Sequence, residues 1–294
     1  MSLFLLTGIA TLDIINSVDH YPLEDEELRA TKRRLTPGGN ALNTANMLSR
    51  LGHRAELLVQ FANDPAAAFI QETLTTYNLG HRYCPHVNGA TPTSYITLNT
   101  ANGSRTIVHY RDLPELDHTA FTQLPIEQFD WLHFEGRNVS ETLKMIRHAR
   151  KRLMDQPVSI EIEKPRTHIE ALIPLADIII FSRAYARAKG YASANDLLLH
   201  MRSLNHHASL ICAWGEEGAW ALEAEKQSAA HIIHTAAAQD RVIDTLGAGD
   251  TLNAGLIGAL ADGDFLEEAL DKAVTLASHK IANHGFEHLH PNKT

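Results

Sequence analysis

The sequence has few cysteines and fewer basic than acidic side chains. Two cysteines in 294 residues cannot form a disulfide framework and are typical of a reducing compartment, so we expect a cytoplasmic protein. Lysine and arginine number 26 against 35 aspartates and glutamates, and the net charge of -9 argues against nucleic acid or an anionic membrane as partner. The ordinary apolar share of 44% indicates a compact globular chain.

Three further features are missing. The apolar start Leu3–Ile9 lacks a basic flank and is interrupted by Asp13, too early for a signal peptide or a membrane span. The chain has no Walker A motif and no Gly-x-Gly-x-x-Gly, which disfavours P-loop enzymes and a simple dinucleotide site. No linker or repeat divides the chain, so we expect a single domain over residues 1–294.

Short apolar runs alternate with helical patterns along most of the chain. Leu3–Ile9, Val158–Ile162 and Ile178–Phe181 are such runs, bounded by polar residues, glycine or proline. This alternation predicts an α/β fold with a mostly parallel central sheet flanked by helices. Because such sheets bind ligands at the carboxyl ends of their strands, site residues should follow the apolar runs.

Two segments break this alternation. Residues 14–36 and 92–112 read as strands, and the second contains polar and apolar residues in alternation around an Asn102-Gly103 turn. We expect both to form a small accessory sheet beside the main domain, able to act as a lid or as a dimer surface.

The strongest local signal is the glycine-rich run Asp244–Thr251, followed by the apolar helix pattern Leu252–Leu260. Small residues before a helix let backbone N–H groups hold a phosphoryl group, and we assign this role to Gly247, Ala248 and Gly249. Asp250 would then accept a proton from the attacking hydroxyl. The alternative is an aspartate N-cap after a glycine turn.

A second glycine-rich segment, Pro37–Asn43, precedes another helix pattern. Gly39 permits close approach of a ligand to the backbone, and Asn40 and Asn43 lie one helical turn apart. Their amides donate and accept hydrogen bonds, which suits sugar hydroxyls. The alternative is a helix start with an asparagine cap.

Other candidates are weaker as single residues. Asp13 follows the first apolar run and Arg105 lies on the expected hairpin, where a carboxylate and a guanidinium suit hydroxyls and a transferring phosphate. Both are open to being plain surface charges. The turn at Gly215, Glu216 and Gly218 could line a nucleotide pocket or be only a turn.

Acidic residues also end two of the apolar runs. Glu135 follows the run from Trp131, and Glu161 and Glu163 end the run from Val158. A parallel sheet places ligands at such positions, and solvated rim charges are the alternative.

The run Asp244–Ile257 (DTLGAGDTLNAGLI) resembles the second signature of the ribokinase-like (PfkB) carbohydrate kinases. Within that family the chain is most similar to the ketohexokinase branch. Further segments carry the likeness: Gly38–Asn43, Gly103–Ile107, Glu135–Asn138, Glu161–Arg166 and Cys212–Ala219.

This resemblance implies a Rossmann-like domain with a small β-sheet lid, ATP and Mg²⁺ as cofactors, and a homodimer whose lid sheets clasp one another. It implies that Asp250 is the catalytic base and that Gly247, Ala248 and Gly249 form the anion hole. The remaining implied contacts are Asp13, Gly39, Asn40, Asn43 and Arg105 with the sugar, and Gly215, Glu216, Gly218, Gly247 and Gly249 with the nucleotide.

The Asn-x-x-Glu motif by which many relatives hold Mg²⁺ is missing, because Ser182-Arg183-Ala184-Tyr185 stands in its place. The metal ligands therefore stay unassigned, and dependence on a monovalent cation stays open. We expect an ATP-dependent sugar kinase that acts on a ketohexose such as fructose and yields fructose 1-phosphate. The alternatives are a related kinase for ribose, another ketose, a nucleoside or a sugar phosphate, and a catalytically idle sugar-binding regulator.

Overall fold

The central sheet of the computed structural model, which describes residues 1–224, 231–238 and 242–289, has the strand order β14-β13-β12-β11-β10-β9-β1-β4. In this sheet β12, β11, β10, β9, β1 and β4 run parallel to one another. The strands β13 and β14 are antiparallel additions at one edge. This confirms the mostly parallel α/β fold. The strands are β1 (Leu3–Thr7), β4 (Arg54–Leu58), β9 (Trp131–Glu135), β10 (Val158–Ile162), β11 (Ile178–Ser182), β12 (Ser209–Ala213), β13 (Ala219–Leu222) and β14 (Ile232–Thr235).

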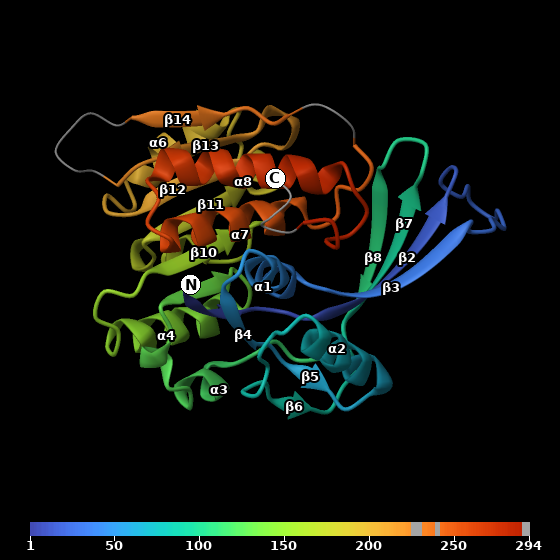
Figure 1. Ribbon diagram of the computed structural model, residues 1–294, viewed down its shortest axis with the longest axis horizontal. Helices are drawn as coiled ribbons and strands as arrows, with labels where there is room; N and C mark the ends of the chain where they lie inside the picture. Colours follow the sequence, from blue (N-terminus) through green and yellow to red (C-terminus); the bar gives the residue numbers. More distant parts are fainter. Residues whose placement is uncertain (225–230, 239–241, 290–294) are drawn as a thin grey trace.

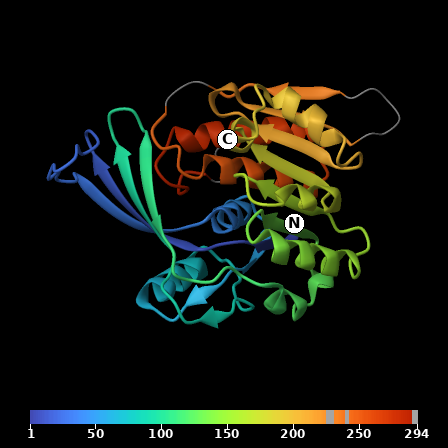
Figure 2. The same ribbon diagram turned by 180° about the vertical axis from the view of Figure 1, so that it is seen from behind.

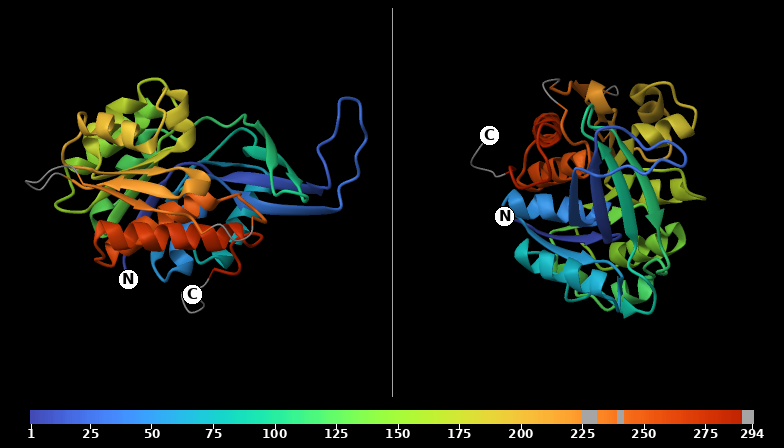
Figure 3. Two further views of the ribbon diagram at one scale, coloured as in Figure 1. Left: turned by 90° about the horizontal axis from the view of Figure 1, so that it is seen from above. Right: turned by 90° about the vertical axis from the view of Figure 1, so that its right-hand side faces the viewer.

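Helices cover both faces of this sheet, as the views in Figures 2 and 3 show. The alternation of side chains along a strand divides the core between the two faces: Phe4 and Leu6 of β1 point to one cluster and Leu5 to the other. The first face is covered by α1 (Asn40–Arg50), α2 (Pro65–Thr76), α7 (Ala248–Ala261) and α8 (Leu266–Ile281). The second is covered by α3 (His118–Thr122), α4 (Val139–Arg150), α5 (Arg183–Ala188) and α6 (Ala194–Arg202).

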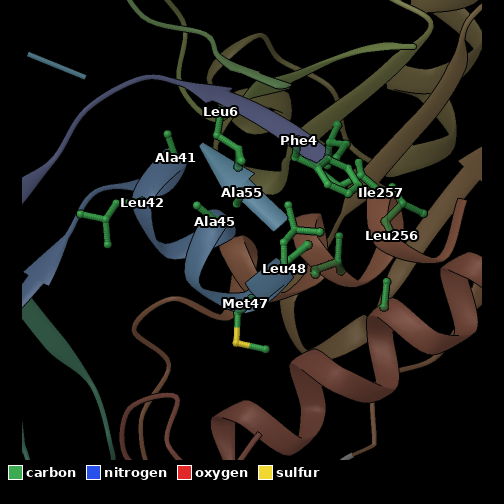
Figure 4. Packing of buried hydrophobic residues seen from close by; sticks show 14 of the residues in the cluster. Phe4, Leu6, Ala41, Leu42, Ala45, Met47, Leu48, Ala55, Leu256 and Ile257 are labelled. Carbon is green, nitrogen blue, oxygen red and sulfur yellow. The ribbon is translucent and has the colours of Figure 1, made fainter. Parts of the chain in front are cut away.

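The helices α1 and α7, which carry Asn40, Asn43 and Asp250, are anchored in the first cluster. Ala45 and Leu48 of α1 and Leu256 and Ile257 of α7 belong to this one cluster, and Figure 4 shows them among its residues. Close packing of α7 on α8 depends on Gly255, where a β-carbon would lie 2.9 Å from the Cα of Ala273. The two N-termini that face the site are therefore fixed by apolar packing.

A four-stranded sheet with the order β3-β2-β7-β8 projects from one end of the molecule (Figure 1). Its strands are β2 (Thr11–Val18), β3 (Lys32–Gly38), β7 (Thr93–Asn99) and β8 (Arg105–Tyr110). The pairs β2/β3 and β7/β8 are antiparallel, and β2 and β7 join them in parallel. This confirms the expected accessory sheet, which we call the lid sheet; a two-stranded sheet, β5 (Phe61–Ala62) with β6 (His86–Val87), lies apart from it.

Several predicted boundaries differ from the structure. The first strand ends at Thr7 and not at Ile9, and the lid strand β2 begins at Thr11, so the chain leaves the central sheet earlier than expected. The helix α7 begins at Ala248, before the predicted Leu252, because its glycine-rich start is already helical. Short 3₁₀ turns complete the described secondary structure at Ile126–Gln128, Ile169–Leu175 and Gly215–Glu217. Within the described ranges, no helix is both long and apolar enough to cross a membrane.

Candidate active site

The N-terminus of α7 places Asp250 inside the protein. The N-cap is Gly247, with φ of 80°, and Asp250 is the third residue of the helix. Its side chain is buried, and its Oδ2 accepts a hydrogen bond of 2.7 Å from Nδ2 of Asn43. The alternative of an aspartate N-cap is therefore wrong, because Gly247 holds that position. Since the first N–H groups of a helix have no acceptor within it, the turn from Gly247 to Gly249 carries donors beside the carboxylate, of which the N–H of Ala248 donates to the carbonyl oxygen of Thr245 at 3.3 Å.

The N-terminus of α1 meets the same place from the opposite side. Gly39 is its N-cap, and a β-carbon there would lie 2.3 Å from the carbonyl oxygen of Ile9, so only glycine fits. Asn40 donates from Nδ2 to Glu161 at 3.0 Å and to Glu163 at 3.3 Å. The asparagine-cap alternative is therefore wrong too, because the amide of Asn40 reaches the end of β10 instead of its own helix.

Asp13 lies on β2 with 5% of its surface exposed, so it is not a surface charge. Its Oδ1 accepts a hydrogen bond of 2.8 Å from the hydroxyl of Thr11. Burial raises the pKa of Asp13, and hydrogen bonds from Thr11 and Ser94 oppose that rise. A β-carbon at Gly38 would lie 2.1 Å from Oδ2 of Asp13, so this glycine makes room for the carboxylate.

Carboxylates converge around Asp250. Burial raises the pKa of Asp250, and the negative charges of Glu135, Glu163 and Asp13 add to the rise while the bond from Asn43 opposes it. Burial and the charge of Asp250 likewise raise the pKa of Glu161 well above its usual value. Glu135 is fixed by the backbone N–H of Ile9 at 3.0 Å. The strand-end glutamates are thus mostly buried parts of one acidic site, and not solvated rim charges.

Arg105 brings the lid sheet to the glycine-rich loop. It is exposed at the start of β8 and donates from Nη1 to the hydroxyl of Thr245. Next to it, Leu246 packs against a small cluster formed by Ile15, Ile96 and Leu98 of the lid sheet. The lid sheet and the loop before α7 are therefore in contact.

The candidate nucleotide residues form a separate turn after β12. Gly218 has φ of 91°, and a β-carbon there would lie 2.0 Å from the carbonyl oxygen of Thr235, so the turn is held tightly against the segment after β14. Glu216 forms an ion pair of 2.9 Å with Arg183 on α5. The turn lies at the same carboxyl edge of the sheet as Glu161, but β11 stands between their strands, so the structure does not bring it to the residues around Asp250.

No group of three or more histidine, cysteine or acidic side chains in the described residues is arranged to hold a metal ion. Ser182, at the position where a metal-binding asparagine motif was missing, caps α5 by accepting from the N–H of Tyr185 at 3.0 Å. Its hydroxyl also donates to the carbonyl oxygen of Glu163 at 2.5 Å. This segment serves the fold and contributes one contact to the acidic site.

Some contacts around the site were not predicted from the sequence. Asp244 and Thr245 belong to the predicted glycine-rich run but were given no role, and Lys280, which is fully buried beside them, was not predicted. A signal for Lys280 exists, because it continues the three- and four-residue spacing of Ala273 and Leu276 on the buried face of α8. Lysine at such a position indicates a buried charge that needs a partner.

The model of the pfkB family of carbohydrate kinases matches residues 1–293. The chain belongs to this family. It is 36% identical over 293 residues to the ketohexokinase of Mus musculus, covering 96% of this chain and 97% of the mouse protein. It is 24% identical to a fructosamine kinase of Bacillus subtilis, covering 92% and 89% of the two chains.

The fold of this pfkB-family kinase is shared with solved structures. Arabidopsis thaliana ribokinase, complexed with ribose and ATP, superposes with a TM-score of 0.78 at 19% identity, over 97% of this chain and 94% of that one. The adenosine kinase of Sinorhizobium meliloti superposes with a TM-score of 0.78 at 20% identity, over 97% and 95%. The protein is thus an ATP-dependent carbohydrate kinase with a ribokinase-like fold.

Proposed function

We propose that this kinase phosphorylates a ketohexose, with fructose as substrate and fructose 1-phosphate as product. The observation that carries the proposal is the identity of 36% to mouse ketohexokinase over nearly the whole of both chains. Polar groups between the lid sheet and the central sheet support it, because the carboxylate of Asp13 and the amides of Asn40 and Asn43 suit several hydroxyls. Gly39 and Arg105 complete the proposed sugar side.

In the proposed mechanism, Asp250 accepts the proton of the sugar hydroxyl as that oxygen attacks the γ-phosphorus of ATP. Asn43 orients the carboxylate through its hydrogen bond of 2.7 Å. The N–H groups of Gly247, Ala248 and Gly249 stabilise the charge of the transferring group, with the positive end of the α7 dipole behind them. The sugar oxygen becomes the phosphate ester oxygen, and ADP leaves.

A divalent cation, which we propose to be Mg²⁺, neutralises charge on the phosphates of ATP when it is bound. Mg²⁺ prefers oxygen ligands and is usually held by one or two carboxylates together with substrate phosphates. Glu163 fits this pattern, since it follows β10 and its side chain is 37% exposed, with Nζ of Lys164 at 3.3 Å. We propose the turn at Gly215, Glu216 and Gly218 as part of the nucleotide side, at the neighbouring strand end.

The same protein is proposed to be a homodimer that pairs through the lid sheet. Ile14 lies in register with Leu35 on one side and Tyr95 on the other, and Tyr95 pairs with Val108, so these side chains form one row across four strands. Tyr95 and Val108 are 49% and 66% exposed, and Tyr110 on the same face is 54% exposed. An apolar row of this kind suits a two-fold contact with a second copy.

Both cysteines of the kinase are thiols without a disulfide. Burial raises the pKa of Cys84 and of Cys212 to about 12, so neither is a reactive thiolate. This usage supports our proposal of a cytoplasmic protein.

A substrate panel tests the proposal. Purified protein with ATP and Mg²⁺ is assayed for ADP release with fructose, other ketoses, ribose, adenosine and fructose phosphates, and each product is identified by mass and NMR. We expect fructose to give the highest kcat/KM and the phosphate to be on the 1-oxygen. A sugar phosphate would need a cationic side chain to bind its phosphate group. Arg137 is a candidate, but it already forms ion pairs with Glu115 and Glu135, so we do not expect a preference for a sugar phosphate. A higher kcat/KM with ribose or adenosine would contradict the ketohexose assignment.

A further inference from the structure

Lys280 is fully buried beneath the glycine-rich loop. Its Nζ donates to the carbonyl oxygen of Asp244 at 2.9 Å and lies 3.3 Å from Oδ2 of the same residue. It also lies 5.7 Å from the centre of the Phe286 ring, in cation–π range. Placing an ammonium group out of water is costly unless it is paired and hydrogen-bonded, so these contacts fix both Lys280 and its partner.

Asp244 connects this lysine to the loop. Its Oδ1 accepts from the backbone N–H of Leu246 at 2.9 Å, and its Oδ2 accepts from that of Gly285 at 3.3 Å. Burial acts to raise the pKa of Asp244, but Lys280 and these N–H donors outweigh it and hold the pKa below its usual value. The carboxylate is therefore an anion held by groups from α8, the loop and the segment that follows α8, and Nη2 of Arg34 on the lid strand β3 lies 3.6 Å from its Oδ2.

The same contacts continue to the proposed anion hole. Phe286, over which the ammonium lies, touches Gly247 so closely that a β-carbon there would be 2.4 Å from the ring. The end of α8 also binds the loop through its backbone, since the carbonyl oxygen of Ile281 accepts from the N–H groups of Ile243 and Asp244 at 2.7 and 3.1 Å. Figure 1 shows α8 lying along α7 toward the base of the lid sheet.

We propose that Lys280 is a positioning residue for phosphoryl transfer. Its ammonium group holds Asp244, and through Asp244 and Phe286 it fixes the turn whose N–H groups face the transferring phosphoryl group. This inference rests on the proposed catalytic role of Gly247, Ala248 and Gly249. Lys280 does not touch the substrate in this scheme, so its loss lowers kcat and leaves sugar binding almost unchanged.

Two variants test the proposal. Lys280→Met keeps the length of the side chain and removes the ammonium. Lys280→Met with Asp244→Asn also removes the buried negative charge, which in the single variant keeps only Arg34, 3.6 Å away, as its counter-ion. We expect kcat to fall about 10- to 100-fold in both, as for a small displacement of a catalytic group, with less than about threefold change in the KM for the sugar. We expect the double variant to recover the thermal midpoint of the wild type but not its kcat. Recovery of both quantities would show that Lys280 is only a counter-charge and would overturn the proposal.

Chemical rescue gives a second measurement. Lys280→Ala removes the atoms of one propylammonium ion, so added propylamine is expected to raise kcat of this variant several-fold, with tetramethylammonium at equal ionic strength as control. Lys272→Met, on the exposed side of α8, should match the wild type. If neither wild type nor Lys272→Met phosphorylates any sugar, the proposed function fails and this inference with it. If both are active and Lys280→Met equals them in kcat, only this inference fails.

Discussion

The surroundings of Asp250 favour its protonated form in the free protein. Burial is the main cause, and Glu135, Glu163 and Asp13 add like charge around it. A raised pKa makes the ionised carboxylate a stronger base. General-base catalysis is most effective when the pKa of the base lies near the working pH. The hydrogen bond from Asn43 favours the ionised form and keeps the carboxylate at one orientation.

The first prediction concerns the proposed role of Asp250 as the base. We expect Asp250→Asn to lower kcat by about 10²- to 10⁴-fold, the usual contribution of a general base, while ATP binding measured by calorimetry stays within about twofold. The amide is nearly the same size, so the fold should be retained. Asp271→Asn, on the exposed side of α8, is the matched control and should keep wild-type kcat. Normal turnover by Asp250→Asn would show that another group accepts the proton.

The second prediction is a shift in pH dependence. In the proposed mechanism the active form of Asp250 is the carboxylate, so kcat/KM should rise with pH, and the midpoint of that rise reports the raised pKa of the free enzyme. Glu135→Gln removes one negative charge that disfavours ionisation of Asp250. The pKa of Asp250 should therefore fall, and the rising limb should move to lower pH.

Its measurement is a pH profile of kcat/KM with saturating ATP. Glu267→Gln, at the exposed start of α8, removes a distant charge and should leave the midpoint in place. An unchanged midpoint in Glu135→Gln would mean that the rising limb belongs to a different group.

For single residues, the sequence predicted which side chains form the site better than it predicted which side chains contact one another. Asp250, Asn40 and Asn43 could be chosen because carboxylates and amides next to glycine-rich helix starts suit a phosphate and a sugar. The hydrogen bond from Asn43 to Asp250 joins residues 207 positions apart. It depends on how α1 packs on α7, so no local sequence pattern predicts it. Lys280 was missed because its partner Asp244 lies 36 positions away.

Among the secondary structure elements, α7 shows how tertiary contacts override local preference. Its first residues, Ala248 and Gly249, follow Gly247 and read as a loop, because glycine is a poor helix former. In the structure, Phe286 packs on Gly247 and Asn43 binds Asp250, so the first turn is held in helical form. The helix therefore begins before the apolar spacing that predicted it.

The third prediction separates the fold of this helix start from its chemistry. A β-carbon at Gly249 would meet no atom within 4 Å, so Gly249→Ala should keep or raise stability, by up to about 1 kcal/mol from helix propensity. The added methyl group would occupy the space next to the N–H donors. We therefore expect kcat to fall by about tenfold or more, as when one such donor is lost.

Two glycine variants are its controls. Gly247→Ala combines φ of 80° with a clash against Phe286, and it should lose both stability and activity. Gly263→Ala has φ of 97° and open space, so it should lose about 1 to 2 kcal/mol of stability and keep its kcat. Thermal unfolding and initial rates are measured on all three. If Gly249→Ala kept the kcat of the wild type, the proposed role of this turn as the anion hole would be wrong.

At the scale of the whole molecule, the lid sheet has two different faces. The face toward the glycine-rich loop buries Ile15 and Ile96, which pack with Leu246. The other face exposes Tyr95 and Val108 to solvent. Because successive side chains of a strand alternate between faces, this asymmetry was partly visible in the alternation of residues 93–99. The parallel pairing of β2 with β7 was not, because it joins segments about 80 residues apart.

The last prediction uses the exposed face. If two copies pair through the row formed by Ile14, Leu35, Tyr95 and Val108, a two-fold axis brings the same residues of both copies together. Val108→Glu would then place two carboxylates in one apolar contact, where burying charge without a partner opposes association. We expect the wild type to sediment as a dimer at micromolar concentration and Val108→Glu as a folded monomer with an unchanged thermal midpoint. Leu199→Glu, 52% exposed on α6, should stay dimeric. If Val108→Glu stayed dimeric, the two copies would pair through another surface. If the wild type were monomeric, the proposed homodimer would be wrong.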